Sequence, residues 1–168
     1  MKIILICLLI SLFGFSVFAI TIYDGIGITA IQTVTPNIAP VINVGLSAQF
    51  ANFYNIGLQI GGVYPLEYGY TTNTDENRFY LLFSAGAMTS NNSTFNLIAG
   101  TSNIPFGYTN SYLPVVGLSE IYYTNTSITG AYIETKLLFP IVSTKPFGFG
   151  LPVIIVTMGG TLNFKGGD

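Results

Sequence analysis

Apolar and polar residues alternate along most of this chain. The clearest stretch is 43–50, in which each apolar residue is preceded by a small or polar one: Val44, Leu46, Ala48 and Phe50 against Asn43, Gly45, Ser47 and Gln49. The segment 55–61 repeats this pattern almost residue for residue, and 25–32 is a weaker copy. Successive side chains of a β-strand point to opposite faces, so a period of two predicts strands with one apolar face.

The same pattern continues to the end of the chain. It predicts eight strands, at 22–33, 41–51, 55–69, 78–88, 94–101, 112–123, 127–139 and 152–164. The connections left between these ranges are alternately long and short: 34–40, 52–54, 70–77, 89–93, 102–111, 124–126 and 140–151. Up-and-down barrels of outer membranes have short turns at one end and longer loops at the other. We therefore expect an all-β fold, an antiparallel up-and-down β-barrel of about eight strands.

Composition places this barrel in a bilayer. Only 7% of the residues are charged and the mean hydropathy is +0.60, whereas soluble domains carry about 25% charged residues. Beyond the first 19 residues the chain has no continuous apolar run of the length that a spanning helix needs. A closed barrel is the other structure that satisfies every backbone polar group inside a membrane.

The first 19 residues have the pattern of a secretory signal peptide. Lys2 supplies the positive charge, residues 3–18 are uncharged and mostly apolar, and Val17 and Ala19 are the small residues before a cut at Ile20. The sequence therefore predicts a signal peptide at 1–19 and one β-barrel domain at 20–168, which is exported to the outer membrane.

The last predicted strand ends on an aromatic residue. Ile154, Val156, Met158 and Leu162 alternate with more polar neighbours up to Phe164. In this respect the chain resembles the small outer-membrane β-barrel proteins, whose terminal strand is recognised by the barrel-assembly machinery. The resemblance implies that this machinery and the lipid bilayer are the partners. The four residues after Phe164 depart from the class, which usually stops at the aromatic.

The chain lacks residues that several kinds of catalytic and metal site require. The chain has no His, and its single Cys, Cys7, lies in the predicted leader. These absences argue against a Ser-His-Asp or Cys-His catalytic site and against the commonest metal ligand. A net charge of −2 offers no basic surface for nucleic acid. We expect no enzyme activity, no cofactor, no metal and no nucleic-acid partner; the oligomeric state is left open.

Charged residues inside the late strands form the candidate polar cluster. We expect Glu120, Glu134 and Lys136 to lie in the lumen as a structural ion cluster, since Glu134 and Lys136 are two residues apart and share one face. Catalytic carboxylates of the glycosidase kind are the less favoured interpretation. In the 102–111 connection, Phe106 and Tyr108 are the candidate loop contacts for a ligand.

The predicted role is structural or a surface interaction, because eight strands enclose a narrow lumen filled by side chains. One alternative is a secreted soluble β-barrel or sandwich that binds a small apolar ligand or self-assembles. The other is a membrane enzyme acting on lipid, which the absence of His disfavours.

The chain should therefore behave as a membrane barrel. We expect it to fractionate with outer membranes, to give the circular dichroism of β-sheet in detergent, and to migrate differently on gels with and without heating, because a closed barrel resists unfolding by detergent. Recovery of a soluble monomer from the periplasm or the medium would contradict this expectation.

Overall fold

Nine strands make up the described part of the chain. The structure, a computed structural model, describes residues 17–31, 37–50, 53–63, 78–90, 92–103, 112–124, 128–144 and 147–165. The strands are β1 (Val17–Ile31), β2 (Asn37–Phe50), β3 (Tyr54–Val63), β4 (Arg78–Ser90), β5 (Ser93–Ser102), β6 (Leu113–Thr124), β7 (Thr129–Thr144), β8 (Phe147–Phe149) and β9 (Val153–Lys165).

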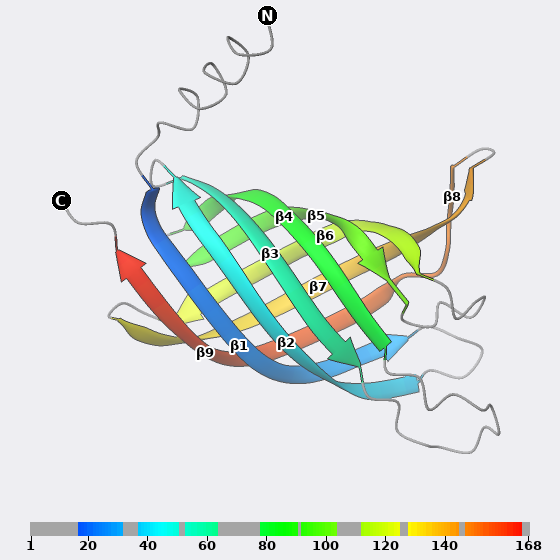
Figure 1. Cartoon of the computed structure of the whole chain (residues 1–168), viewed down its shortest axis with the longest axis horizontal. Helices are drawn as coiled ribbons and strands as arrows, with labels where there is room; N and C mark the ends of the chain where they lie inside the picture. Colours follow the sequence, from blue (N-terminus) through cyan, green and yellow to red (C-terminus); the bar gives the residue numbers. More distant parts are fainter. Residues whose placement is uncertain are drawn as a thin grey trace, which may run out of the picture.

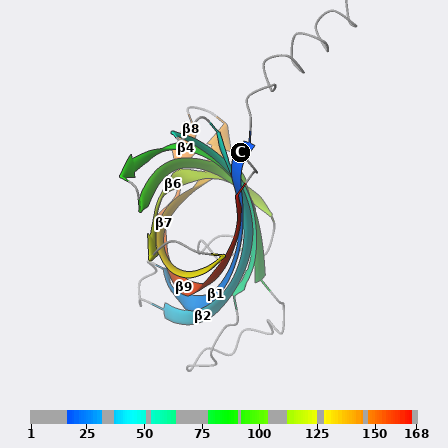
Figure 2. The same ribbon diagram turned by 90° about the vertical axis from the view of Figure 1, so that its left-hand side faces the viewer.

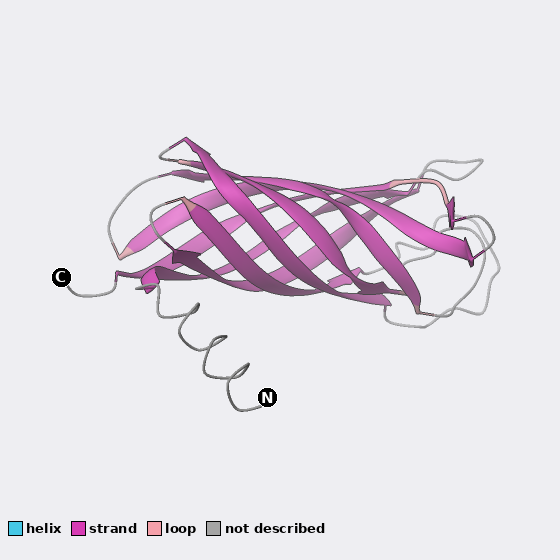
Figure 3. Ribbon diagram, turned by 90° about the horizontal axis from the view of Figure 1, so that it is seen from above, coloured by secondary structure: helices cyan, strands magenta, loops and turns pink. Residues whose placement is uncertain are grey.

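Eight of these strands form a closed antiparallel barrel. Each strand from β1 to β7 pairs with the next, β9 pairs with both β1 and β7, and the ring is thereby complete. Figure 2 shows this ring from one end, and Figure 3 shows the tilt of the strands across it. The short β8 pairs with the far end of β7 and stands out from the barrel (Figure 1).

The alternation of the sequence locates these strands well, with one informative difference. The third strand is described up to Val63, and the rest of its predicted range, 64–69, lies outside the described residues. The predicted connection 140–151 was wrong in part, because β7 continues to Thr144 and turns back into β8. Pairing between Ile141 and Phe149 extends the hairpin beyond the barrel wall. The predicted cut after Ala19 lies inside β1, next to a register irregularity between Val17 and Ala19.

The two ends of the barrel differ in their connections. At the turn end, the short segments 51–53, 91–92 and 125–128 join successive strands. At the loop end, the strands are joined by 32–36, by the much longer 64–77 and 103–112, and by the segment that contains β8. Strand β1 begins and β9 ends at the turn end (Figure 1). The predicted alternation of long and short connections is therefore confirmed.

The outer wall of the barrel is apolar on all sides. Leu46 and Leu58 are 47% and 41% exposed, whereas their chain neighbours Ser47 and Gln59 are 5% and 1% exposed. Most of the other large exposed side chains of the wall are aliphatic or aromatic, among them Ile22, Ile26, Ile60, Phe83, Leu97, Ile133, Ile154, Met158 and Leu162. A soluble barrel would turn this face inward, so the wall suits hydrocarbon and not water.

Two carboxylates interrupt the outer wall. Asp24 is exposed between Ile22 and Ile26 in the middle of β1, opposite Gly160 of β9. Glu120 is exposed nearer the turn end of β6 and accepts a hydrogen bond of 3.2 Å from Ser93. The described part of the chain contains no helix that is long and apolar enough to cross a membrane.

The depth of a charge on the outer wall should decide its cost. Leu46→Arg should lower the free energy of unfolding from lipid vesicles by about 2–4 kcal/mol, the range for a cation near the bilayer midplane. Phe53 is half exposed in the 51–53 turn, so Phe53→Arg should cost only about 0–1 kcal/mol at the interface. Denaturant titration of both variants checks this, and equal losses would contradict the assignment of the wall to lipid.

Candidate functional site in the barrel lumen

Most of the buried side chains in the loop-end half of the lumen are apolar, although Thr29, Arg78 and Ser102 are buried there as well. Val41, Leu82, Leu138, Val153 and Ile155 are at most 1% exposed and belong to one contiguous cluster. They come from β2, β4, β7 and β9, at positions close to where these strands begin or end at the loop end. The lumen is thus largely apolar on this side. The outward-facing residues of the same strand segments, such as Ile42 and Ile154, are apolar as well. In these segments polar and apolar residues no longer alternate along the strand, but buried and exposed residues still do.

A polar belt crosses the lumen at mid-height. Its centre is the ion pair between Lys136 Nζ and Glu134 Oε2, 2.7 Å apart, with both side chains wholly buried. The two residues lie two apart on β7, so both point inward. Lys136 Nζ also lies 5.8 Å from the ring centroid of Tyr80. A buried charge is tolerated only with such a partner, because the cost of removing it from water is several kcal/mol.

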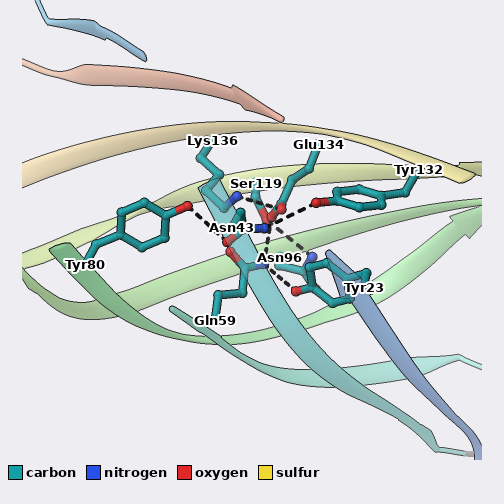
Figure 4. A network of polar contacts seen from close by, with 9 residues as sticks. All are labelled: Tyr23, Asn43, Gln59, Tyr80, Asn96, Ser119, Tyr132, Glu134 and Lys136. Carbon is teal, nitrogen blue, oxygen red and sulfur yellow. Dashed lines mark hydrogen bonds and ion pairs between the residues drawn. The ribbon is translucent and has the colours of Figure 1, made fainter. Parts of the chain in front are cut away.

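Gln59 ties the ion pair to the opposite wall. Its Nε2 donates to Glu134 Oε1 at 2.8 Å and to the Tyr23 hydroxyl at 2.6 Å. Strand β3, which carries Gln59, is four strands from β7 in either direction around the ring. These bonds therefore span the whole lumen, as Figure 4 shows.

Asparagines extend the belt around the ring. Asn43 accepts a bond of 3.0 Å from the Tyr80 hydroxyl and donates to that of Tyr132 at 3.4 Å. Asn96 donates to Ser119 at 3.4 Å (Figure 4). Asn96 also accepts a bond of 3.3 Å from Asn55. The belt therefore joins β1 to β7 through side chains as well as through the sheet.

Glycines provide the space for the tyrosines of the belt. Gly45 and Gly61 are the cross-strand neighbours of Tyr23 and Tyr80. A Cβ at either glycine would collide with the tyrosine ring that covers it. The large ring on one strand thus fills the gap that the glycine leaves on the next, an arrangement known as aromatic rescue in sheets.

The turn-end side of the belt is mixed, with a small aromatic cluster among polar side chains such as Ser47, Asn55 and Thr161. Tyr23, Ile121 and Tyr132 form a second buried cluster, against which Tyr123 packs. The rings of Tyr23 and Tyr132 meet edge to face with 5.1 Å between their centroids. Buried side chains therefore line the described part of the lumen from the loop end to the turn end, and the polar groups of the belt bind one another.

This geometry differs from that of a glycosidase site. The carboxylate of Glu134 is held by Lys136 and Gln59, whereas the other carboxylates that the structure describes, those of Asp24 and Glu120, are exposed on the outer wall. A glycosidase pair needs two carboxylates about 5–10 Å apart with a sugar between them. Nor does the described part of the chain bring together three His, Cys, Asp or Glu residues that could hold a metal.

The structure divides the predicted cluster. Glu134 and Lys136 lie together in the lumen, but Glu120 lies on the outer wall. The reason is register: Glu134 pairs with Ile121, so Glu120 is opposite Thr135 and shares its outward face. The grouping of Glu120 with the lumen pair was therefore wrong. Phe106 and Tyr108 lie outside the described residues.

Sequence reasoning missed the uncharged members of the belt. The sequence pattern places Gln59 and Asn43 on the polar faces of their strands, but it does not predict the residues to which they bond. Tyr23 and Tyr80 are aromatic residues that occur at inward positions, and a signal for them exists in the glycines of the adjacent strands. That signal is legible only once the register is known.

The fold is that of a small eight-stranded outer-membrane β-barrel. The chain matches no protein-family profile, and no curated protein matches it. It is similar to the solved structure of Ail, the attachment invasion locus protein of Yersinia pestis, in complex with the heparin analogue sucrose octasulfate. The TM-score is 0.51 and the identity 10%, over 88% of this chain and 99% of that one. A de novo designed transmembrane β-barrel gives a TM-score of 0.49 at 11% identity, over 87% of this chain and 95% of that one.

The effect of the ion pair on stability should depend on whether each buried charge has its partner. Lys136→Met leaves the Glu134 carboxylate buried without its cation, so we expect a loss of about 3–5 kcal/mol in the free energy of unfolding. The double variant Glu134→Gln/Lys136→Met should lose clearly less, because no charge is left unpaired.

Unfolding in lipid vesicles measures both losses. Thr135→Val is the matched control, since residue 135 lies between the pair on the same strand and faces outward; it should change little. If Lys136→Met cost no more than the double variant, the two side chains would not be coupled.

Proposed function

We propose that this protein is an exported outer-membrane barrel that presents its loop end at the cell surface for interaction, and that it is neither a diffusion pore nor an enzyme. The filled lumen carries this proposal. Polar and apolar buried side chains line the described part of the barrel between its two ends. With the interior committed to packing, the surfaces left for function are the outer wall and the two ends.

The unequal ends favour the loop end as the functional surface. The connections 64–77 and 103–112 are much longer than the turns at the other end. Loops on a rigid scaffold carry a disproportionate share of binding residues. Because β1 begins and β9 ends at the turn end, we assign that end to the periplasm and the long connections to the outside.

Two segments of the chain support a route of delivery to the membrane. Residues 1–19 have the features of a signal peptide, and β9 ends close to Phe164, which is exposed on the outer wall. We propose that the leader is removed and that the barrel-assembly machinery inserts the barrel. Cleavage after Ala19 would leave the pairing of Ile20 with Ala48 and with Phe164 intact.

The partner of the loop end should not be a polyanion. The barrel of Ail was solved with a sulfated sugar, but an identity of 10% extends only the fold to this chain. A sulfated partner requires clustered basic residues, whereas the 64–77 connection contains Glu67, Asp75 and Glu76 and no Lys or Arg. Aromatic residues such as Phe106 and Tyr108 suit contact with an uncharged surface or sugar better.

Insertion of an epitope tests the orientation and the surface role together. A tag placed after Thr74, in the longest connection, should bind antibody on intact cells. The same tag after Asn125, in a turn at the opposite end, should bind only after the outer membrane is permeabilised. Labelling of the Asn125 insertion on intact cells would invert the orientation and remove the loop end from the surface.

A further inference from the structure

A groove lies on the outer wall where three barrel strands meet the β8 hairpin. It has a volume of about 520 Å³ and is lined by Leu97 of β5, Val116 and Leu118 of β6, Phe139 of β7 and Phe149 of β8. Ile98 and Gly117 complete the lining. Its size falls within the range of about 300–1,000 Å³ of small-molecule sites. We call it the outer groove.

The pairing of the strands explains why the wall is hollowed there. Ala99, Val116 and Phe139 are cross-strand neighbours on the outer face, so two small side chains adjoin a large ring. Phe149 then meets Phe139 edge to face, with 6.2 Å between ring centroids. Since β8 pairs with the extension of β7, Phe149 stands beside the wall and forms one side of the groove.

The lining selects an apolar occupant. Its side chains are aliphatic or aromatic, and none carries a charge or a hydrogen-bonding group. A polar ligand would lose its bonds to water without finding partners in the groove. Water itself needs two to four polar partners to occupy such a space.

The position of the groove identifies that occupant. Leu97 and Leu118 continue directly into the exposed apolar wall of β4 to β7, so the groove opens onto the lipid-facing surface. A second copy of this chain would present a convex barrel wall, which fits a recess poorly. A single flexible hydrocarbon chain can follow the shape of the recess.

We propose that the outer groove is a binding site for one acyl chain of a membrane lipid, held against β5–β7 by Phe149. The inference rests on the proposed placement of the barrel in a membrane. It assigns a function to the β8 hairpin, which otherwise only lengthens the loop end. The lipid chain would replace the contacts that the small side chains of Ala99 and Val116 leave unmade.

A tryptophan reporter tests the proposal, because the chain has no Trp of its own. Phe139→Trp places the reporter in the groove, and Leu46→Trp places one on the wall of β2, away from it. In detergent micelles, a phospholipid with brominated acyl chains should quench the Phe139→Trp fluorescence in a saturable way, near one lipid per protein. The Leu46→Trp fluorescence should fall only in proportion to the lipid content of the micelle.

A matched pair of variants locates the site. Val116→Phe fills the groove and, combined with Phe139→Trp, should reduce the quenching of that reporter to the proportional response. Val44→Phe, the same change at an exposed wall position of β2, should leave saturable quenching intact. The heat-dependent gel shift of each variant shows that it is folded.

The outcomes separate this inference from the proposed function. Proportional quenching of both reporters in micelles overturns the acyl-chain site, even if both are quenched in vesicles. A reporter in the groove that is shielded from lipid in a cross-linkable dimer also overturns it, in favour of a second copy. If the Leu46→Trp reporter is not quenched even in vesicles of brominated lipid, the placement in a membrane fails as well.

Discussion

Closure of the sheet is the constraint on which the rest of this structure depends. A chain whose outer wall is apolar cannot leave backbone N–H and C=O groups facing that wall, because lipid offers them no partner. Pairing of β1 with β9 and of β6 with β7 removes every free edge from the barrel strands that the structure describes. Once the ring has eight strands, its interior is narrow, and the side chains that point inward must fill it.

Filling a narrow ring explains the distribution of large and small residues inside it. Tyrosine rings reach across the lumen from β1, β4 and β7, and glycines on the adjacent strands leave room for two of them. The hydroxyl groups at the tips of these rings then need partners, which Asn43 and Gln59 provide. The polar belt is in this sense a consequence of packing: rings long enough to fill the lumen bring polar tips into its centre.

The sequence predicts the fold well and the interior only in part, for one physical reason. Alternation of polarity along a strand is a local property, and it locates all eight barrel strands and assigns Leu46 and Ser47 to opposite faces. Which residue of one strand lies beside which residue of the next depends on register, and a shift of one residue reverses the face. Glu120 was grouped with Glu134 because the register of β6 and β7 was not known. The largely apolar loop-end half of the lumen was not foreseen, because Val153 and Ile155 face inward among neighbours that are equally apolar.

The attraction within the ion pair does not depend on that register. Glu134 and Lys136 lie on the same strand, so their attraction is the same in every alignment of β7 with its neighbours. The bonds that depend on alignment are those that cross the lumen, from Gln59 of β3 to Glu134 and from Asn43 of β2 to Tyr132. A slip of one residue would turn Glu134 and Lys136 toward lipid together and leave Gln59 without its acceptor. The buried charges therefore destabilise alignments that turn them toward lipid, and the cross-lumen bonds stabilise the observed alignment. An interior of Val, Leu and Ile alone would distinguish neighbouring registers less sharply, because these side chains pack almost equally well in each of them.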